Sequence, residues 1–248
     1  MNQLLTILFF SATIATSGCG NRQEVDIRKE LNKNDSLARQ NIPVLFGQPN
    51  IIDSSHIIIY PLILQRIMQD GGYASSSSYG EKTSYWNLVF YNTETGAKTL
   101  LTDNQRISIN SFTVGSSSSY SSGSDVIWKE GINLASNSIF YNVVTNDFNQ
   151  NKTLDEGDPT YLFVSDKEGR GFRQISPDNY DITSWSIVRG TNKVIMQGRS
   201  DQNKDKRFTV ADREEHFITD LTRGGKATPV FSVAYTDSLR TKFINNWK

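Results

Sequence analysis

The chain has 248 residues, of which 21% are charged and 11% aromatic, and its 26 Lys and Arg balance its 26 Asp and Glu. Balanced charge excludes the basic excess that favours binding to nucleic acid or to an anionic membrane surface, so we expect no nucleic-acid partner. The single cysteine excludes an internal disulfide, but a chain of this length can bury a core without one.

The N-terminal segment is apolar and uncharged. No charged side chain occurs in residues 1–19, and a short apolar run from Leu4 to Phe10 leads through small residues to Thr16-Ser17-Gly18-Cys19. A run this short does not span a bilayer comfortably, because a transmembrane helix needs about 20 apolar residues. The segment resembles the signal peptide of bacterial lipoproteins, although it lacks a basic residue at its start and has Thr16 where that family usually has Leu.

The resemblance implies that residues 1–18 are removed and that the thiol of Cys19 carries a lipid, so that the membrane is contacted through this lipid. By the sorting rules of that family, Gly20 without a following acidic cluster implies the outer membrane, on the periplasmic side rather than the cell surface. The alternatives are an ordinary secretory signal and a buried helix with a spare cysteine. Residues 19–42 are polar and predict a tether, and Pro43 and Pro49 mark the entry to a folded domain over residues 43–248.

Three sets of β-rich segments follow, each with a tight turn before its last strand. The first set predicts strands at 56–60, 62–64, 86–91 and 98–102, the second at 138–144, 161–164 and 172–175, and the third at 193–196, 216–218 and 228–231. Further strands are predicted between the sets at 107–114 and 182–188. The fold class is therefore all-β, built from repeated four-stranded antiparallel units, which is typical of propeller blades. A β-sandwich is the alternative.

The segment Thr160-Tyr-Leu-Phe-Val-Ser-Asp-Lys-Glu-Gly-Arg-Gly-Phe-Arg-Gln-Ile-Ser-Pro177 resembles the blade phrase of Tol-system β-propeller proteins. Residues 86–103 and 215–231 resemble it more loosely. The resemblance implies a propeller-like domain and says little about activity. Only about three units can be counted, with leftover strand material at 44–46 and 242–247. The terminal pieces could form a fourth unit, the array could stay open, or two chains could close it.

An acidic loop occurs twice, beginning at Asp147 and again at Asp201, and each copy has oxygen-bearing side chains at positions 1, 3, 5 and 12. This spacing is typical of loops that wrap Ca²⁺, which prefers several oxygen ligands. The candidate metal ligands are Asp147, Asn149, Asn151, Asp155 and Asp158 in the first loop, and Asp201, Asn203, Asp205 and Asp212 in the second.

The loops depart from the EF-hand pattern at position 6, where Lys152 and Lys206 replace Gly, and at position 12, where Asp replaces Glu. We expect a structural Ca²⁺ that stiffens each connection. The alternative is a plain hairpin connection held by turns that Asp and Asn side chains favour.

No catalytic constellation is evident. The two histidines, His56 and His216, lie apart within strand patterns, and no nucleophile motif accompanies them. The four tryptophans, Trp86, Trp128, Trp185 and Trp247, are expected mainly in blade cores, although an exposed set could bind glycan. We therefore expect a lipid-anchored envelope protein that binds or scaffolds another envelope protein, without catalysis. The alternatives are a glycan-binding or glycan-cleaving β-protein of the same compartment, and a structural lipoprotein whose domain supports assembly.

Overall fold

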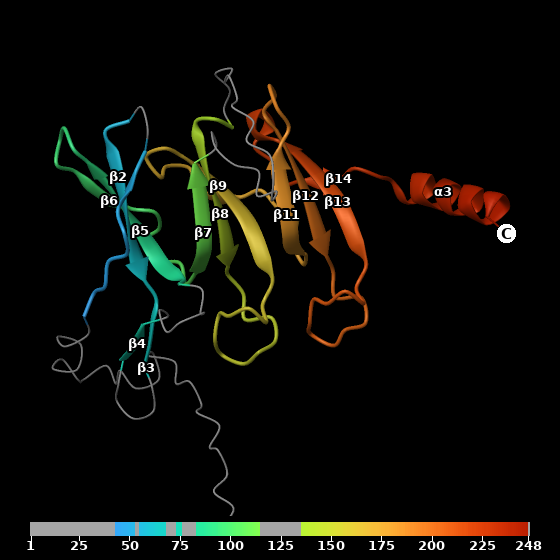
Figure 1. The fold of residues 1–248 in the computed structure, drawn as a ribbon, viewed down its shortest axis with the longest axis horizontal. Helices are drawn as coiled ribbons and strands as arrows, with labels where there is room; N and C mark the ends of the chain where they lie inside the picture. The colour runs from blue at the N-terminus through green and yellow to red at the C-terminus, as the bar shows by residue number, and fades with distance from the viewer. Residues whose placement is uncertain (1–42, 53–54, 68–72, 76–82, 115–134, 248) are drawn as a thin grey trace, which may run out of the picture.

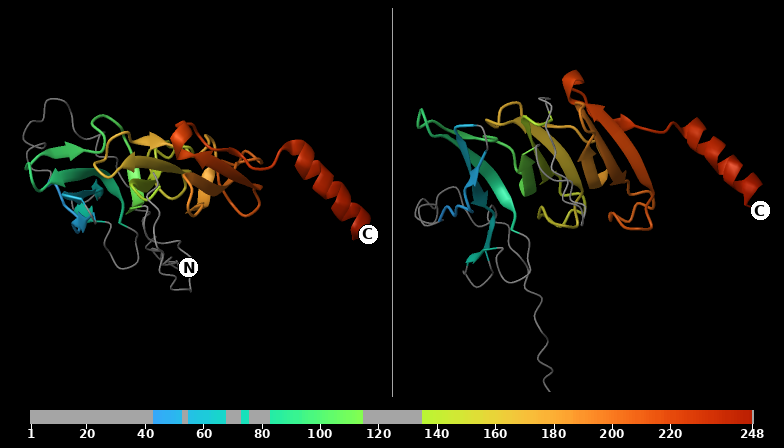
Figure 2. Two further views of the ribbon diagram at one scale, coloured as in Figure 1. Left: turned by 90° about the horizontal axis from the view of Figure 1, so that it is seen from above. Right: turned by 45° about the horizontal axis from the view of Figure 1, so that its top comes forward.

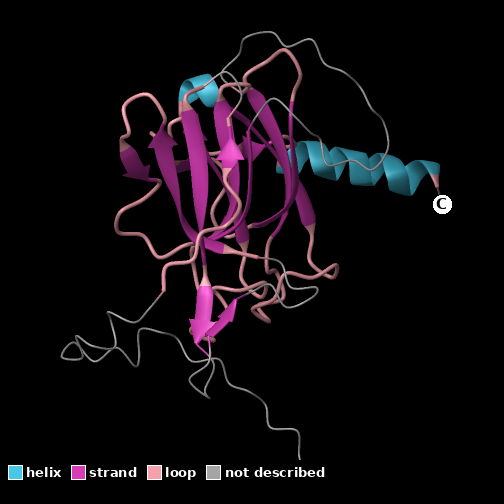
Figure 3. Cartoon of the chain, turned by 60° about the vertical axis from the view of Figure 1, so that its left-hand side comes forward, coloured by secondary structure: helices cyan, strands magenta, loops and turns pink. Residues whose placement is uncertain are grey.

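The computed structural model describes residues 43–52, 55–67, 73–75, 83–114 and 135–247. Within these residues the chain is almost entirely β, with one α-helix near its C-terminal end, as Figure 3 shows. The predicted signal segment, the predicted lipid-attachment residue Cys19, the predicted tether and Trp128 lie outside the described residues.

Twelve of the strands form three antiparallel units. Unit 1 contains β1 (Asn50–Ile51), β2 (Ile57–Ile63), β5 (Tyr85–Asn92) and β6 (Lys98–Leu100). Unit 2 contains β7 (Ser108–Val114), β8 (Ser138–Val144), β9 (Thr160–Asp166) and β10 (Arg173–Gln174). Unit 3 contains β11 (Asp181–Ile187), β12 (Lys193–Arg199), β13 (Glu214–Asp220) and β14 (Thr228–Pro229). A small hairpin of β3 (Gln65–Ile67) and β4 (Tyr73–Ser75) interrupts unit 1.

Within each unit, strands that are consecutive in the unit pair antiparallel. Units 1 and 2 share one hydrogen-bonded sheet only because Tyr85 of β5 pairs with Ile109 of β7. The three units lie in series across Figure 1, and the view from above in Figure 2 shows the same order. The prediction of repeated four-stranded antiparallel units is thus confirmed.

Two apolar cores lie in series, one on each face of unit 2. The first core joins units 1 and 2, and the second joins units 2 and 3. Because strand side chains alternate between the two faces of a sheet, neighbouring residues of β8 enter different cores: Ile139 and Tyr141 enter the first, and Phe140 enters the second. This stacking of three sheets differs from the predicted alternative, since a sandwich encloses a single core between two sheets.

A glycine turn brings units 1 and 2 into close contact. Gly169, in the turn before β10, has φ +80°, and a Cβ at this position would lie 2.5 Å from the ring of Phe90 in unit 1. Glycine is therefore required at this position both by its backbone conformation and by the ring that it covers.

Two details of the strand prediction are wrong. The separate strands expected at 56–60 and 62–64 form the single strand β2, in spite of Pro61. The Pro61 carbonyl accepts the N–H of Gly47, so its missing amide points toward the irregular segment before β1 and not toward β5. At the other end, β14 stops at Pro229, before the predicted end at residue 231.

The prediction of strand material at 242–247 is also wrong, because residues 242–246 belong to α3 (Val233–Asn246) and Trp247 directly follows the helix. Ser232 caps the helix by accepting the N–H of Tyr235. No residue of α3 is buried, and the helix extends beyond unit 3 (Figure 1). At the N-terminal end, residues 44–46 contribute only an isolated bridge between Phe46 and Leu62. The two terminal pieces therefore do not combine into a fourth unit in the described chain.

Candidate functional site

The two acidic loops occupy equivalent places in units 2 and 3. Residues 147–158 connect β8 to β9, and residues 201–212 connect β12 to β13. Figure 1 shows both loops at the same end of the array, below the strands that they connect. The loop that is repeated in the sequence is thus also repeated in the structure, and the candidate ligands of the two loops lie in equivalent places.

The last aspartate of each loop closes it through backbone amides. Asp158, which is 3% exposed, accepts the N–H groups of Phe148 (2.7 Å) and Asn149 (3.3 Å) at Oδ1 and that of Asp155 (3.1 Å) at Oδ2. Burial raises the pKa of Asp158, and the three backbone hydrogen bonds oppose that rise. Asp158 therefore ties the two ends of the loop together.

Asp212 has the same role in the second loop. It is 5% exposed and accepts the N–H of Gln202 (3.4 Å) at Oδ1 and that of Thr209 (2.8 Å) at Oδ2. In both loops, position 12 thus binds the amide of position 2 with one oxygen and that of position 9 with the other. The candidate ligand at position 12 is held against backbone donors in both copies.

The first aspartate of each loop turns the chain sharply. Asp147 Oδ2 accepts the N–H of Lys152 at 2.8 Å, and Asp201 Oδ2 accepts that of Lys206 at 3.0 Å. Both lysines lie in the left-handed region, with φ of 75° and 62°. The lysines at position 6 thus adopt a conformation that usually favours glycine, which accounts for how the loops turn without one.

The residues at positions 3 and 5 form two successive side-chain turns in each loop. In the first, Asn149 Oδ1 accepts the N–H of Asn151 (2.9 Å), and Asn151 Oδ1 accepts that of Thr153 (2.8 Å). The second repeats both bonds, from Asp205 to Asn203 Oδ1 (3.0 Å) and from Arg207 to Asp205 Oδ1 (2.9 Å). Such turns leave a lone pair on Asn149, Asn203 and Asp205 Oδ1 available to a further partner. Asn151 Oδ1, by contrast, also lies 2.6 Å from the Thr153 hydroxyl oxygen.

Asp155, at position 9, is held within the first loop. Its Oδ1 accepts the N–H of Gly157 at 2.8 Å, and its Oδ2 accepts from the Thr153 hydroxyl at 2.6 Å and from Asn151 Nδ2 at 2.8 Å. The structure therefore gathers the predicted residues of the first loop into one hydrogen-bonded network.

One atom in this network lacks a donor. Asp147 Oδ1 is buried and has no hydrogen-bond partner. A buried carboxylate oxygen without a donor is costly, so this atom fits a cation in the loop better than it fits an empty interior. Among the described residues, no group of three or more His, Cys, Asp and Glu side chains is arranged to hold a metal ion. A cation here would consequently need the amide oxygens of Asn149 and Asn151 as well as carboxylates.

The two loops contact each other, a feature that the sequence spacing did not reveal. The rings of Phe148 and Phe208 lie 4.9 Å apart between centroids, and Lys206 Nζ donates to Gln150 Oε1 at 2.8 Å. The sequence feature that could have indicated this contact is the pair of phenylalanines, one at position 2 of the first loop and one at position 8 of the second. This contact couples the two candidate sites physically.

The histidines and tryptophans lie away from these loops. His56 Nε2 lies 3.3 Å from Glu94 Oε1 with both side chains mainly exposed, and the ring of His216 contacts Phe231. Trp185 stacks on Phe140 and donates from Nε1 to Asn142, so it belongs to the second core region. Trp86 and Trp247 are exposed, on β5 and after α3 respectively.

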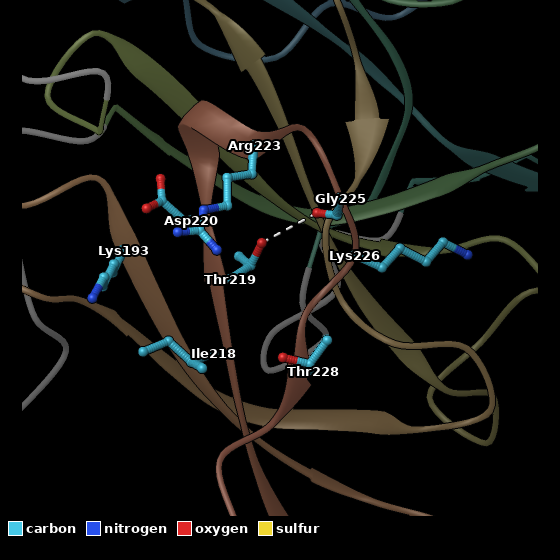
Figure 4. A pocket seen from close by; sticks show the side chains of 8 residues that line it. All are labelled: Lys193, Ile218, Thr219, Asp220, Arg223, Gly225, Lys226 and Thr228. Carbon is cyan, nitrogen blue, oxygen red and sulfur yellow. Dashed lines mark hydrogen bonds between the residues drawn. The ribbon is translucent and has the colours of Figure 1, made fainter.

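A shallow pocket of about 290 Å³ lies at one end of unit 3 (Figure 4). It is lined by Lys193, Ile218, Thr219, Asp220, Arg223, Gly225, Lys226 and Thr228. The Thr219 hydroxyl donates to the Gly225 carbonyl at its centre. The pocket is separate from both acidic loops: the second loop connects the opposite ends of β12 and β13, and the first loop belongs to unit 2. In the described part of the chain, no helix is long and apolar enough to cross a bilayer.

Comparison with known proteins gives weak likenesses. A scan against protein-family models found no match, and a search of curated proteins found none either. Among solved structures, tricorn protease matches 73% of this chain at 12% identity with a TM-score of 0.36, and this chain spans 18% of the protease chain. A TolB-like protein from Agrobacterium tumefaciens matches 76% of this chain and 68% of its own at 10% identity, with a TM-score of 0.30. The support for the architecture described above therefore comes from the strand pairing within this chain and not from these likenesses.

Proposed function

We propose that this protein is a non-catalytic binding or scaffolding module of the bacterial cell envelope, stiffened by Ca²⁺ in its two acidic loops and held to the membrane by a lipid on Cys19. The observation that carries the metal proposal is the buried Oδ1 of Asp147 in the first loop, which has no donor. The second loop repeats the bond from the amide of position 6 to the aspartate of position 1, and its equivalent oxygen, Asp201 Oδ1, accepts the N–H of Asp205 at 3.2 Å. The envelope location is supported by the lipoprotein-like segment that ends at Cys19.

The chemistry of the donors favours a hard cation. In the first loop, Asp147, Asn149, Asn151 and Asp155 would hold the ion, and in the second Asp201, Asn203 and Asp205 would do so. Asp158 and Asp212 would act mainly by closing the loops, because their oxygens already accept backbone N–H groups. When bound, Ca²⁺ would supply positive charge that relieves repulsion among the loop carboxylates and would restrict the connection between two strands.

A binding role without catalysis is supported by where the reactive side chains lie. Both histidines are exposed, and their neighbours within the structure are a surface carboxylate and a phenyl ring. General acid–base catalysis instead favours groups that converge on one substrate position. A stiff array with two large sheet faces suits the display of a surface to another envelope protein.

Thermal unfolding with excess Ca²⁺ and with chelator tests the metal proposal. An ion at about a hundredfold excess over its Kd stabilises a single site by about 2.7 kcal/mol, which raises the Tm by roughly 5–10 °C in a domain of this size. The double variant Asp147→Asn, Asp201→Asn should lose this rise, because Asn retains an acceptor for the amide at position 6 but removes the charge.

Glu156→Gln is the matched control, because it removes one exposed carboxylate from the same loop. It should retain the full Ca²⁺ effect. An identical Tm with Ca²⁺ and with chelator in the unsubstituted protein would refute the metal proposal and leave the loops as hairpin connections.

The lipid proposal is tested separately by metabolic labelling with a fatty acid. The unsubstituted protein should incorporate label and partition with membranes, and Cys19→Ser should do neither. Label in the Cys19→Ser protein would show that the lipid is attached elsewhere, and an unlabelled unsubstituted protein would refute the lipid proposal, whatever the result with Ca²⁺.

A further inference from the structure

The two sheet faces at the ends of the array carry apolar side chains that are half-buried or exposed. We name the outer face of unit 1 the N-terminal face, made by Phe46, Ile51, Ile58, Tyr60, Val89, Tyr91 and Leu100. We name the outer face of unit 3 the C-terminal face, made by Ile195, His216, Ile218, Val230 and Phe231. Figures 1 and 2 show these units at opposite ends of the series.

Each junction inside the chain follows one rule. A cross-strand pair on the C-terminal side of one unit packs against a pair on the N-terminal side of the next. At the first junction, Ile59 and Phe90 of unit 1 share a core with Tyr141 and Phe163 of unit 2. All four side chains are buried.

The second junction repeats this arrangement. Phe140 and Val164, which pair across β8 and β9, share a core with Met196 and Phe217, which pair across β12 and β13. The same register thus places an apolar pair on each side of both junctions.

The register continues onto both outer faces. On unit 3, Ile195 pairs with Ile218 at the position that Phe140 and Val164 occupy on unit 2. Ile195 is 42% exposed. On unit 1, Tyr60 pairs with Val89, on the N-terminal side that Tyr141 and Phe163 occupy on unit 2. The chain therefore presents one unpaired face of each kind.

The N-terminal face is unusually apolar for a solvent-facing sheet. Tyr60 contacts both Phe46 and Tyr91, with ring centroids 6.4 Å apart in each case. Phe46 is 57% exposed and Ile51 is 76% exposed. Exposed apolar side chains that gather on one face are typical of an interaction surface.

The C-terminal face of unit 3 is more polar than the equivalent face of unit 2, which suits a contact between separate molecules. Gln197 and His216 form the pair that corresponds to Asn142 and Leu162 of unit 2, so one apolar residue is replaced by a polar one. The pocket beside Ile218 adds a recess to this face (Figure 4). Interfaces between separate molecules are more polar than the interior of a domain.

We propose that the N-terminal face of one copy of this chain binds the C-terminal face of a second copy, forming a third junction of the kind found twice inside the chain. The contact is heterologous, and making it twice in a pair of copies closes a ring of six units, within the range of about four to eight blades of closed propellers. The proposal does not depend on Ca²⁺ or on the lipid.

Sedimentation velocity of the full-length protein, solubilised in detergent over a wide range of concentration, tests this junction. The unsubstituted protein should form a dimer. Tyr60→Glu on the N-terminal face and Ile195→Glu on the C-terminal face should each raise the dissociation constant by about tenfold or more. Circular dichroism and thermal unfolding establish that each variant is folded.

Mixing the two variants distinguishes this contact from others. Tyr60→Glu retains an intact C-terminal face and Ile195→Glu an intact N-terminal face, so an equimolar mixture should regain a dimer joined by one junction. A symmetric contact through one face would leave one single variant dimeric and would overturn the proposal. A monomeric unsubstituted protein, or no recovery on mixing, would also overturn it.

The exposed helix α3 is the competing occupant of the N-terminal face. Leu239 and Phe243 are 45% and 64% exposed, and the double variant Leu239→Glu, Phe243→Glu should remain dimeric. If this variant dissociates while Ile195→Glu remains dimeric, α3 makes the contact and the proposed junction is wrong. Val210→Glu, at an 89% exposed position in the second acidic loop, is the control for adding charge in place of an apolar side chain.

Discussion

Removing the carboxylate that closes the first acidic loop should destabilise the protein more than the equivalent change in the second. Asp158→Ala deletes the acceptor of three backbone N–H groups, at 2.7, 3.3 and 3.1 Å. Asp212→Ala deletes the acceptor of two, at 3.4 and 2.8 Å, and of a long bond from the Thr209 hydroxyl. Hydrogen bonds to a charged group contribute about 1.5–3 kcal/mol each, and less when they are long.

The net loss is smaller than the sum of these bonds. Burial raises the pKa of Asp158, so removing the carboxylate also removes a desolvation cost. We therefore expect Asp158→Ala to lower the free energy of unfolding by about 3 kcal/mol and Asp212→Ala by about 2 kcal/mol. Glu156→Ala, an exposed change of the same charge in the first loop, should stay within about 0.5 kcal/mol of the unsubstituted protein.

Urea unfolding followed by tryptophan fluorescence, with chelator present throughout, measures these differences without any contribution from a bound ion. An Asp158→Ala protein as stable as Glu156→Ala would show that the backbone hydrogen bonds to Asp158 do not stabilise the fold. A larger loss for Asp212→Ala than for Asp158→Ala would likewise show that the amide bonds do not determine the stability of the loops.

Three further predictions concern packing and pH. A double-mutant cycle of Phe148→Ala and Phe208→Ala in urea should give a coupling energy of about 0.5–1.5 kcal/mol, because the two rings are in contact; additive losses would show that the loops are independent. Gly169→Ala should lower the free energy of unfolding by more than about 2 kcal/mol. Gly96→Ala, also at positive φ but with open space around it, should lower it by about 1 kcal/mol. Equal losses for the two variants in urea unfolding would contradict the close contact with the Phe90 ring. Burial raises the pKa of Asp181 and so favours its neutral form in the folded protein, which means that its contribution to stability falls as the pH rises from its unfolded pKa through its folded pKa. Asp181→Asn should therefore gain stability relative to the unsubstituted protein over that pH range. A difference in urea midpoints that does not change with pH would contradict this.

Much of the fold could be predicted because the central strands have strong, local patterns. The prediction for residues 138–144 coincides with β8, whose side chains are buried on both faces and therefore form a continuous apolar run. By contrast, Phe243, Ile244 and Trp247 favour strands by composition, yet they lie in or directly after a helix. The four-residue spacing of Tyr235, Leu239 and Phe243 was the helical signal that the composition obscured.

The acidic loops illustrate what sequence spacing can and cannot establish. The repeated positions correctly indicated two loops in equivalent places, but the lysines at position 6 gave no indication of their left-handed conformation. That conformation depends on the N–H of Lys152 reaching Asp147 and on the N–H of Lys206 reaching Asp201, bonds that form only once the loop has folded. Contact between the loops likewise depends on how units 2 and 3 pack.

The position of unit 2 between two cores has a consequence for how the protein unfolds. Each core takes residues from unit 2, so either end unit can detach while the other core survives, but loss of unit 2 destroys both. In such a linear array, stability is a sum of unit and neighbour contributions, and opening begins at the ends. Amides of β8 and β9 should therefore be the slowest to exchange with solvent, and the middle of this chain is the part on which its cooperative folding depends.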